Sequence, residues 1–64
     1  MNTKNGQLMN TADASAYLGV RPQLLAQWRH EDRGPAFHRL GRMIRYAKSD
    51  LDAWLADTKV APHR

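Results

Sequence analysis

The chain has 64 residues, which allow one small domain with no room for a deep catalytic cleft. It has no cysteine, which excludes disulfides and thiolate zinc sites, and no apolar run approaches the roughly 20 residues of a membrane helix. The net charge of +4 is concentrated in residues 21–48, where seven basic residues stand against two acidic ones. This distribution favours an anionic partner, and we expect a cytoplasmic protein that uses neither a membrane nor a small-molecule substrate.

A first helix is predicted over residues 12–18. Thr11 is a suitable N-cap, and Asp13 places a negative charge in the first turn, where the helix dipole is positive. Apolar residues follow at the spacing i, i+3, i+4, which gives one inward stripe. Gly19 can adopt a left-handed conformation, so the helix should end there.

A second helix is predicted to begin at Pro22, whose missing N–H costs nothing in a first turn. Its two leucines and Trp28 share one side, with Arg29 flanking them, whereas Gln23, Gln27 and His30 point the other way. Residues 33–35 (Arg-Gly-Pro) should end this helix. Two short helices joined by three residues have the spacing of a helix-turn-helix.

Residues 36–40 and 43–46 are predicted to form a β-hairpin around a two-residue Gly-Arg turn at 41–42. If Leu40, Ile44 and Tyr46 face the core, alternation places Arg39, Met43 and Arg45 outward. This arginine-bearing hairpin after a helix-turn-helix is interpreted as a wing.

A third helix is predicted from about Ser49, with Ser49 and Asp52 forming a capping box. Its apolar stripe of Leu51, Trp54 and Leu55 should close the core. Residues 1–7 and 58–64 are interpreted as tails, so the domain is placed at residues 8–57. The predicted fold is a small, mostly helical α+β domain, a winged helix-turn-helix in the order helix, helix, hairpin wing, helix.

The ordered set of these elements resembles the excisionase family of recombination directionality factors, small AlpA-like domains with a winged, MerR-type helix-turn-helix. The resemblance covers residues 8–56 and rests on residues 11–20, Trp28, residues 34–37, 39–42, 44–46 and 49–55. It implies a protein that binds double-stranded DNA cooperatively and bends it to assist an integrase in excising a mobile element or prophage. The alternative is a small transcriptional regulator of that element, using the same DNA surface.

The resemblance implies a recognition helix in the major groove and a wing on the adjacent minor groove or backbone. The DNA-binding residues predicted on and beside the recognition helix are Arg21, Pro22, Gln23, Gln27 and His30. Those predicted on the wing and its flanks are Arg39, Arg42, Met43, Arg45 and Lys48.

The chain departs from the family pattern in three ways. Arg21 replaces a capping serine and is free to serve a phosphate, and Met43 stands where relatives often carry arginine. Gln23 and Gln27 replace basic residues; because glutamine pairs with adenine N6 and N7, the preferred DNA sequence should differ from that of relatives.

The exposed polar residues also allow other interpretations. The glutamines could lie on a merely solvated face, the arginines could only aid solubility, and the domain could be a protein-interaction module. The aromatic residues Trp28, Tyr46 and Trp54 follow the apolar phase of their elements, which favours core packing over stacking on single-stranded nucleic acid.

No catalytic, metal or cofactor site is expected. His30, His38 and His63 lack the spacing of metal ligands, and Asp50 and Asp52 diverge on a helix, so they cannot act as an acid/base pair. An enzyme is therefore the most remote reading.

Assembly is expected to depend on DNA. Without a coiled-coil seam the protein should be a monomer, or at most a weak dimer, in solution. Several copies should bind neighbouring sites cooperatively and head to tail, with the basic wing of one copy against the acidic Asp50, Asp52 and Asp57 side of the next. We also expect a bacterial protein associated with the nucleoid, and a site-specific integrase as a further partner.

Overall fold

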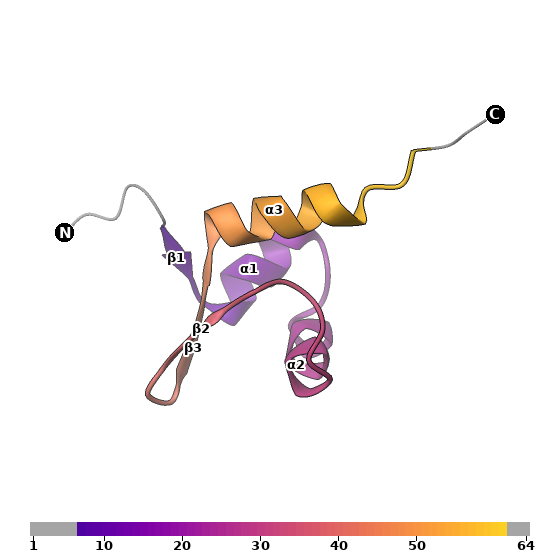
Figure 1. Ribbon diagram of the computed structural model, residues 1–64. Coiled ribbons are helices and arrows are strands. Elements are labelled where there is room, and N and C mark those ends of the chain that lie inside the picture. The colour runs from indigo at the N-terminus through magenta and orange to yellow at the C-terminus, as the bar shows by residue number, and fades with distance from the viewer. Residues whose placement is uncertain (1–6, 62–64) are drawn as a thin grey trace.

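The structure is a computed structural model that describes residues 7–61, in which three helices pack with a three-stranded antiparallel sheet (Figure 1). In chain order the elements are β1 (Leu8–Met9), α1 (Thr11–Leu18), α2 (Pro22–His30), β2 (His38–Leu40), β3 (Met43–Ala47) and α3 (Lys48–Thr58). The strand order is β1-β3-β2, with β3 in the centre. The helices and the hairpin confirm the predicted winged helix-turn-helix.

The first helix has the predicted end but a different cap. Asn10, not Thr11, is the N-cap, and its Oδ1 accepts a 2.8 Å hydrogen bond from the backbone N–H of Asp13. Both residue types cap helices well, so the prediction was wrong by one position. Gly19 ends the helix with φ of 75°, and its N–H donates to the carbonyl oxygen of Ala16 at 3.2 Å.

The second helix begins at Pro22 as predicted, and it ends at His30, slightly before the Arg-Gly-Pro segment. The chain then turns through two residues with positive φ, Asp32 at 59° and Gly34 at 90°. Gly34 lies against the Trp28 ring, since a Cβ placed there would be 2.9 Å from both Cβ and Cε3 of Trp28. This turn therefore depends on glycine for its backbone conformation and for its packing.

The hairpin has the predicted turn, but one of its strands is out of the predicted phase. Leu40 pairs directly with Met43, and Arg39 pairs with Ile44. Directly opposed residues project to the same face of a sheet, so a two-residue turn cannot place Leu40 inward and Met43 outward. Leu40 lies on the outer face and is 44% exposed, whereas Arg39 shares the inner face with Ile44.

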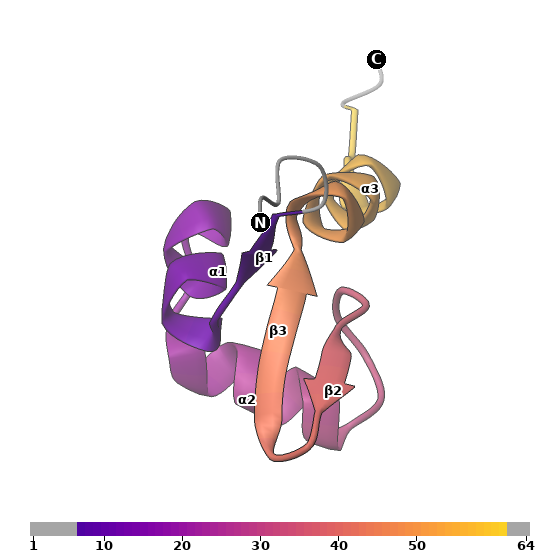
Figure 2. The same cartoon turned by 90° about the vertical axis from the view of Figure 1, so that its left-hand side faces the viewer.

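Strand β1 was not anticipated from the sequence. Leu8 pairs with Ala47 and Met9 with Tyr46, which adds a short edge to β3 (Figure 2). The backbone N–H of Lys48 continues this pairing by donating to the carbonyl oxygen of Gln7 at 3.2 Å.

The third helix begins one residue before the predicted cap. Ala47 is the N-cap, so Ser49 lies inside the helix and the predicted capping box does not form. Within the expected apolar stripe Leu51 is fully buried, but Leu55 is 40% exposed. Of the predicted tails, residues 1–6 and 62–64 lie outside the described residues.

The core joins all three helices to the central strand. Its fully buried residues are Ala14, Leu25, Tyr46 and Leu51. Trp28 packs at the border of this core, where its ring lies 5.2 Å from that of Trp54, centroid to centroid, with a 52° tilt. The aromatic residues thus pack within the domain, as their phase predicted.

Candidate nucleic-acid interface

One face of α2 is polar and exposed. Gln23, Gln27 and His30 lie along it at the spacing of one helical stripe, opposite the fully buried Leu25. The predicted phase of this helix is therefore confirmed. A helix with one anchored apolar side and one free polar side can enter a major groove without losing its contacts to the domain.

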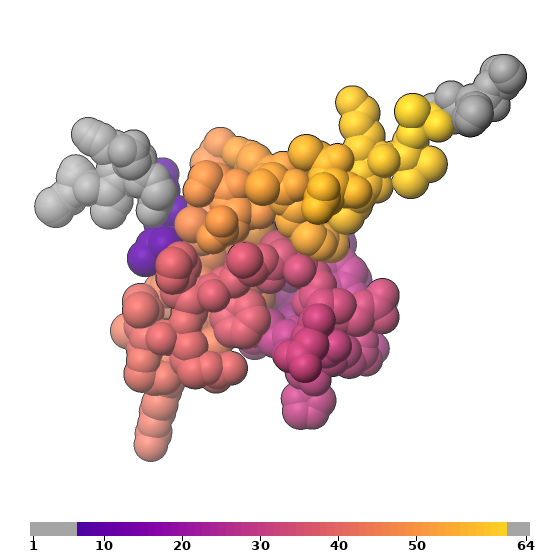
Figure 3. All heavy atoms as spheres, viewed as in Figure 1, coloured from indigo at the N-terminus to yellow at the C-terminus, as the bar shows by residue number. Residues whose placement is uncertain are grey.

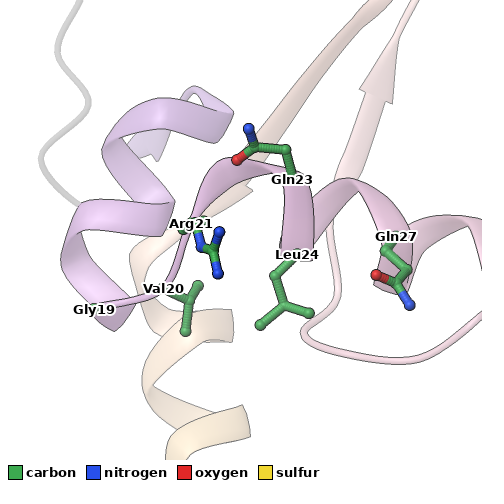
Figure 4. A pocket seen from close by; sticks show the side chains of 6 residues that line it. All are labelled: Gly19, Val20, Arg21, Gln23, Leu24 and Gln27. Atoms are coloured by element: carbon green, nitrogen blue, oxygen red, sulfur yellow. The ribbon is translucent and has the colours of Figure 1, made fainter.

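An open depression lies at the start of this helix. Arg21 and Gln27 stand at its two ends with Leu24 between them, while the Gln23 side chain points away from Leu24 (Figure 4). Arg21 is the N-cap residue, and within residues 7–61 its side chain makes no capping hydrogen bond. The first turn of α2 thus has an exposed guanidinium beside it, an arrangement that suits a phosphate.

Gln27 has an intramolecular partner. Its Nε2 donates to Oε2 of Glu31 at 3.0 Å, and Oε1 of Glu31 accepts from Nη1 of Arg33 at 3.4 Å. All three residues are exposed, so this network exchanges readily with solvent. To contact a base, the Gln27 amide has to leave Glu31, whereas the Gln23 side chain has no hydrogen-bond partner among residues 7–61.

The wing carries its three arginines in different environments. Arg42 lies exposed in the turn, and Arg39 is exposed with its guanidinium carbon 5.7 Å from the centre of the Phe37 ring. Arg45 is half-buried, and its Nη1 donates to the carbonyl oxygen of Ile44 at 2.8 Å. Arg42 is therefore the wing guanidinium with the greatest freedom to reach a phosphate.

A hydrogen bond ties the recognition helix to the wing. Nη1 of Arg29 donates to the hydroxyl of Tyr46 at 2.7 Å, and the same guanidinium lies 5.8 Å from the centre of the Phe37 ring. Tyr46 is fully buried in β3, so Arg29 satisfies a polar atom inside the core. Helix α2 and the hairpin turn lie at the same end of the molecule, away from α3 (Figures 1 and 3).

Comparison with known protein families identifies the family of this chain. A family model described as a helix-turn-helix domain matches residues 8–59, which is most of the chain. The chain belongs to this helix-turn-helix domain family. A comparison with curated proteins found no match. The helix-turn-helix domain is a sequence-specific DNA-binding module, so DNA is the partner of this domain.

Lys48 lies apart from the other predicted contacts of this helix-turn-helix domain. It starts α3, at the opposite end of β3 from the turn, where its Nζ is 3.2 Å from Oδ2 of Asp52 and 5.5 Å from the centre of the Tyr17 ring. The Tyr17 hydroxyl donates to Oδ1 of Asp52, so the three side chains join α1 to α3. Contact of Lys48 with DNA stays a prediction, although its position points to a role between helices.

The charges of this cluster stabilise one another. The pKa of Asp52 is lowered from its ordinary value, first by the hydrogen bond from Tyr17 and then by that from Lys48. The pKa of Lys48 is raised, chiefly by its hydrogen bond to Asp52. Sequence reasoning missed the cluster because Tyr17 and Asp52 are 35 positions apart.

Two further findings concern the described part of the helix-turn-helix domain. Across residues 7–61, histidine and acidic side chains form no group of three that could hold a metal ion, and His63 lies outside this range. None of the helices there combines the length and the apolar character needed to cross a bilayer.

Proposed function

We propose that this protein is an excisionase, a recombination directionality factor that binds and bends DNA so that an integrase can excise a mobile element or prophage. It acts without chemistry of its own. The observation that carries the proposal is the projection of a basic wing and a polar recognition helix from one end of a very small domain (Figure 1).

In this proposal α2 enters the major groove, and the wing reaches the neighbouring minor groove or its phosphates. Gln23 is the best placed base reader, because its exposed amide can pair bidentately with adenine and has no partner to leave first among residues 7–61. Arg21 and Arg42 flank this reader on the turn before α2 and on the wing, and they supply phosphate contacts. Arg39 and Arg45 add positive charge to the wing.

An architectural role is favoured by how few surfaces the domain offers for a stable dimer. In the described range α3 is the last helix, and its 11 residues are fewer than two heptads. A single module of this size buries only about 600–1,000 Å² on DNA, which is small for a tight specific complex. Cooperative binding of several copies would compensate for the small footprint of each.

Charge supports a head-to-tail arrangement of these copies. The wing carries only basic charge, whereas α3, which lies at the other end of the molecule from the hairpin turn (Figure 1), carries Asp50 and Asp57. Such contacts do not close into a ring, so they can continue along the duplex and bend it.

DNase I footprinting on the DNA that flanks the gene tests the role. Protection at an attachment site, together with stimulated excision by the neighbouring integrase, supports the proposal; protection confined to a promoter favours the regulator instead. Arg42→Ala serves as the matched variant and should weaken protection of every site alike.

Salt titration tests the DNA surface itself. If about four to six phosphates are neutralised, log K should fall against log salt with a slope of roughly −3.5 to −5.5. A slope near −1 would refute the combined helix and wing footprint, whatever the biological role.

A further inference from the structure

The wing presents two large apolar side chains to solvent beside its turn. Leu40 and Met43 pair directly with each other, and they are 44% and 50% exposed. They share the face of the hairpin opposite to Ile44 and Tyr46, which pack toward the core. The domain's own core therefore leaves this pair uncovered.

Positive charge surrounds the pair. Residues 36–47 contain three arginines and no acidic residue. Arg42 adjoins Met43 in the turn, and Nη2 of Arg45 lies 3.6 Å from Sδ of Met43. A nucleic-acid groove has phosphates along its edges and stacked bases inside. The guanidinium groups match the phosphates, and the apolar pair matches the bases.

The position of the pair agrees with this partner. The turn projects from the body of the domain at the same end as α2, and its side chains reach beyond the neighbouring elements (Figure 3). When α2 occupies a major groove, a hairpin on that side comes to the adjacent minor groove. Leucine and methionine are among the side chains that proteins insert between base pairs from the minor groove.

We propose that Leu40 and Met43 form an apolar wedge that enters the minor groove and partly unstacks one base step, while Arg42 and Arg45 hold the flanking phosphates. The wedge bends the duplex from a single bound copy, before any neighbouring copy is added. This inference rests on the proposed placement of the wing in the minor groove.

The experiment uses a short duplex with one binding site, selected from a random library with the native protein. The bend is measured by energy transfer between dyes at the two duplex ends, and unstacking by the fluorescence of 2-aminopurine at the base step under the wing. The test variant is the double substitution Leu40→Thr, Met43→Thr, which keeps strand-favouring residues but removes the apolar surface. Met43→Leu is the conservative variant that retains it.

Leu8→Thr is the matched control. Leu8 has the same 44% exposure on the same sheet, but it pairs with Ala47 at the far end of β3 from the turn. Thermal unfolding of each variant establishes that it is folded at the temperature of the assay.

We expect the native protein to bend the single site by at least about 20°, within the range known for wedge insertion. The double threonine variant should lose more than half of this bend and the 2-aminopurine signal with an unchanged salt slope, whereas Met43→Leu and Leu8→Thr should keep both. A native bend that survives in the double variant overturns the wedge. A loss confined to cooperativity on two-site DNA also overturns it and makes the pair a contact between copies. If the native protein shows no salt-dependent DNA binding, the proposed function fails first.

Discussion

Replacing Gly34 with alanine tests the packing of the turn after α2. Gly34 has φ of 90°, and its would-be Cβ lies 2.9 Å from two atoms of Trp28 and 3.2 Å from a third. Trp28 cannot simply withdraw, because its ring packs against Trp54 at 5.2 Å. The new methyl group therefore has to displace an aromatic pair at the border of the core.

Two costs add at this position. A left-handed backbone costs an L-residue about 1–2 kcal/mol, and forcing a methyl group into a filled site costs about 1–3 kcal/mol. Gly34→Ala should thus lower the free energy of unfolding by about 2–5 kcal/mol. A core of this size rarely supplies more than about 3–5 kcal/mol of stability, so the variant should be largely unfolded at room temperature.

Gly19→Ala separates the two costs. Gly19 has φ of 75°, but among the described atoms a Cβ there would meet nothing within 4 Å. This variant should therefore pay only the backbone cost of about 1–2 kcal/mol.

Urea unfolding followed by tryptophan fluorescence gives the free energy of unfolding of the native protein and of Gly19→Ala, and for Gly34→Ala it should show little or no folded baseline. The signal reports directly on the contact because the chain contains only two tryptophans. Circular dichroism provides the matching melting temperatures. A Gly34→Ala protein no less stable than Gly19→Ala would refute the argument that Trp28 fills the space beside Gly34.

Three further predictions concern the interface and its supports. Gln23→Ala should reduce discrimination at one base pair by about 1–3 kcal/mol in competition binding, whereas Arg42→Ala should weaken all sequences alike and reduce the salt slope by about 1; a uniform effect of Gln23→Ala would contradict base reading. Arg29→Met should lower the free energy of unfolding by about 1–3 kcal/mol because it leaves the buried Tyr46 hydroxyl without its donor, and Tyr46→Phe in the same chain should restore part of the loss. The pKa of Asp52 lies below its ordinary value of 3.8 because of its hydrogen bonds with Tyr17 and then with Lys48. Its contribution to the free energy of unfolding is therefore complete above about pH 4 and is lost as the pH falls through the folded-state pKa. Acid unfolding of Asp52→Asn should accordingly depend less on pH than that of the native protein, and identical profiles would dismiss the cluster as a source of stability.

Local signals explain why the helix ends were predictable. Gly19 and Pro22 act through their own backbones, so their positions translate directly into a helix end and a helix start. The cap of α1 was misplaced because Asn10 and Thr11 are adjacent and both can accept the same N–H.

Pairing between distant segments explains most of what the sequence analysis missed. Strand β1 has two residues and exists because β3 offers a free edge, which no property of Leu8 and Met9 announces. The phase of Leu40 is a different case. The two-residue turn was predicted, and its pairing rule already required Leu40 and Met43 to share a face.

The candidate interface was likewise predictable only in part. The exposed stripe with Gln23 and Gln27 follows from helical periodicity, and the structure agrees with it. The Arg29 to Tyr46 hydrogen bond joins residues 17 positions apart, and Lys48 contacts the ring of Tyr17, which belongs to another helix. Neither contact can be read from local spacing.

The hydrogen bond between Arg29 and Tyr46 links α2 directly to the wing, because its acceptor is a phenol held fully buried in the central strand. If α2 and the wing contact DNA as proposed, the protein sets the distance between them, so the duplex has to adjust its groove widths to meet both. The energy of that adjustment depends on the stiffness of base steps that neither element touches. A fixed spacing inside the protein therefore makes affinity depend on how easily the DNA deforms. DNA sites should differ in affinity partly through the base pairs that lie between the contacts.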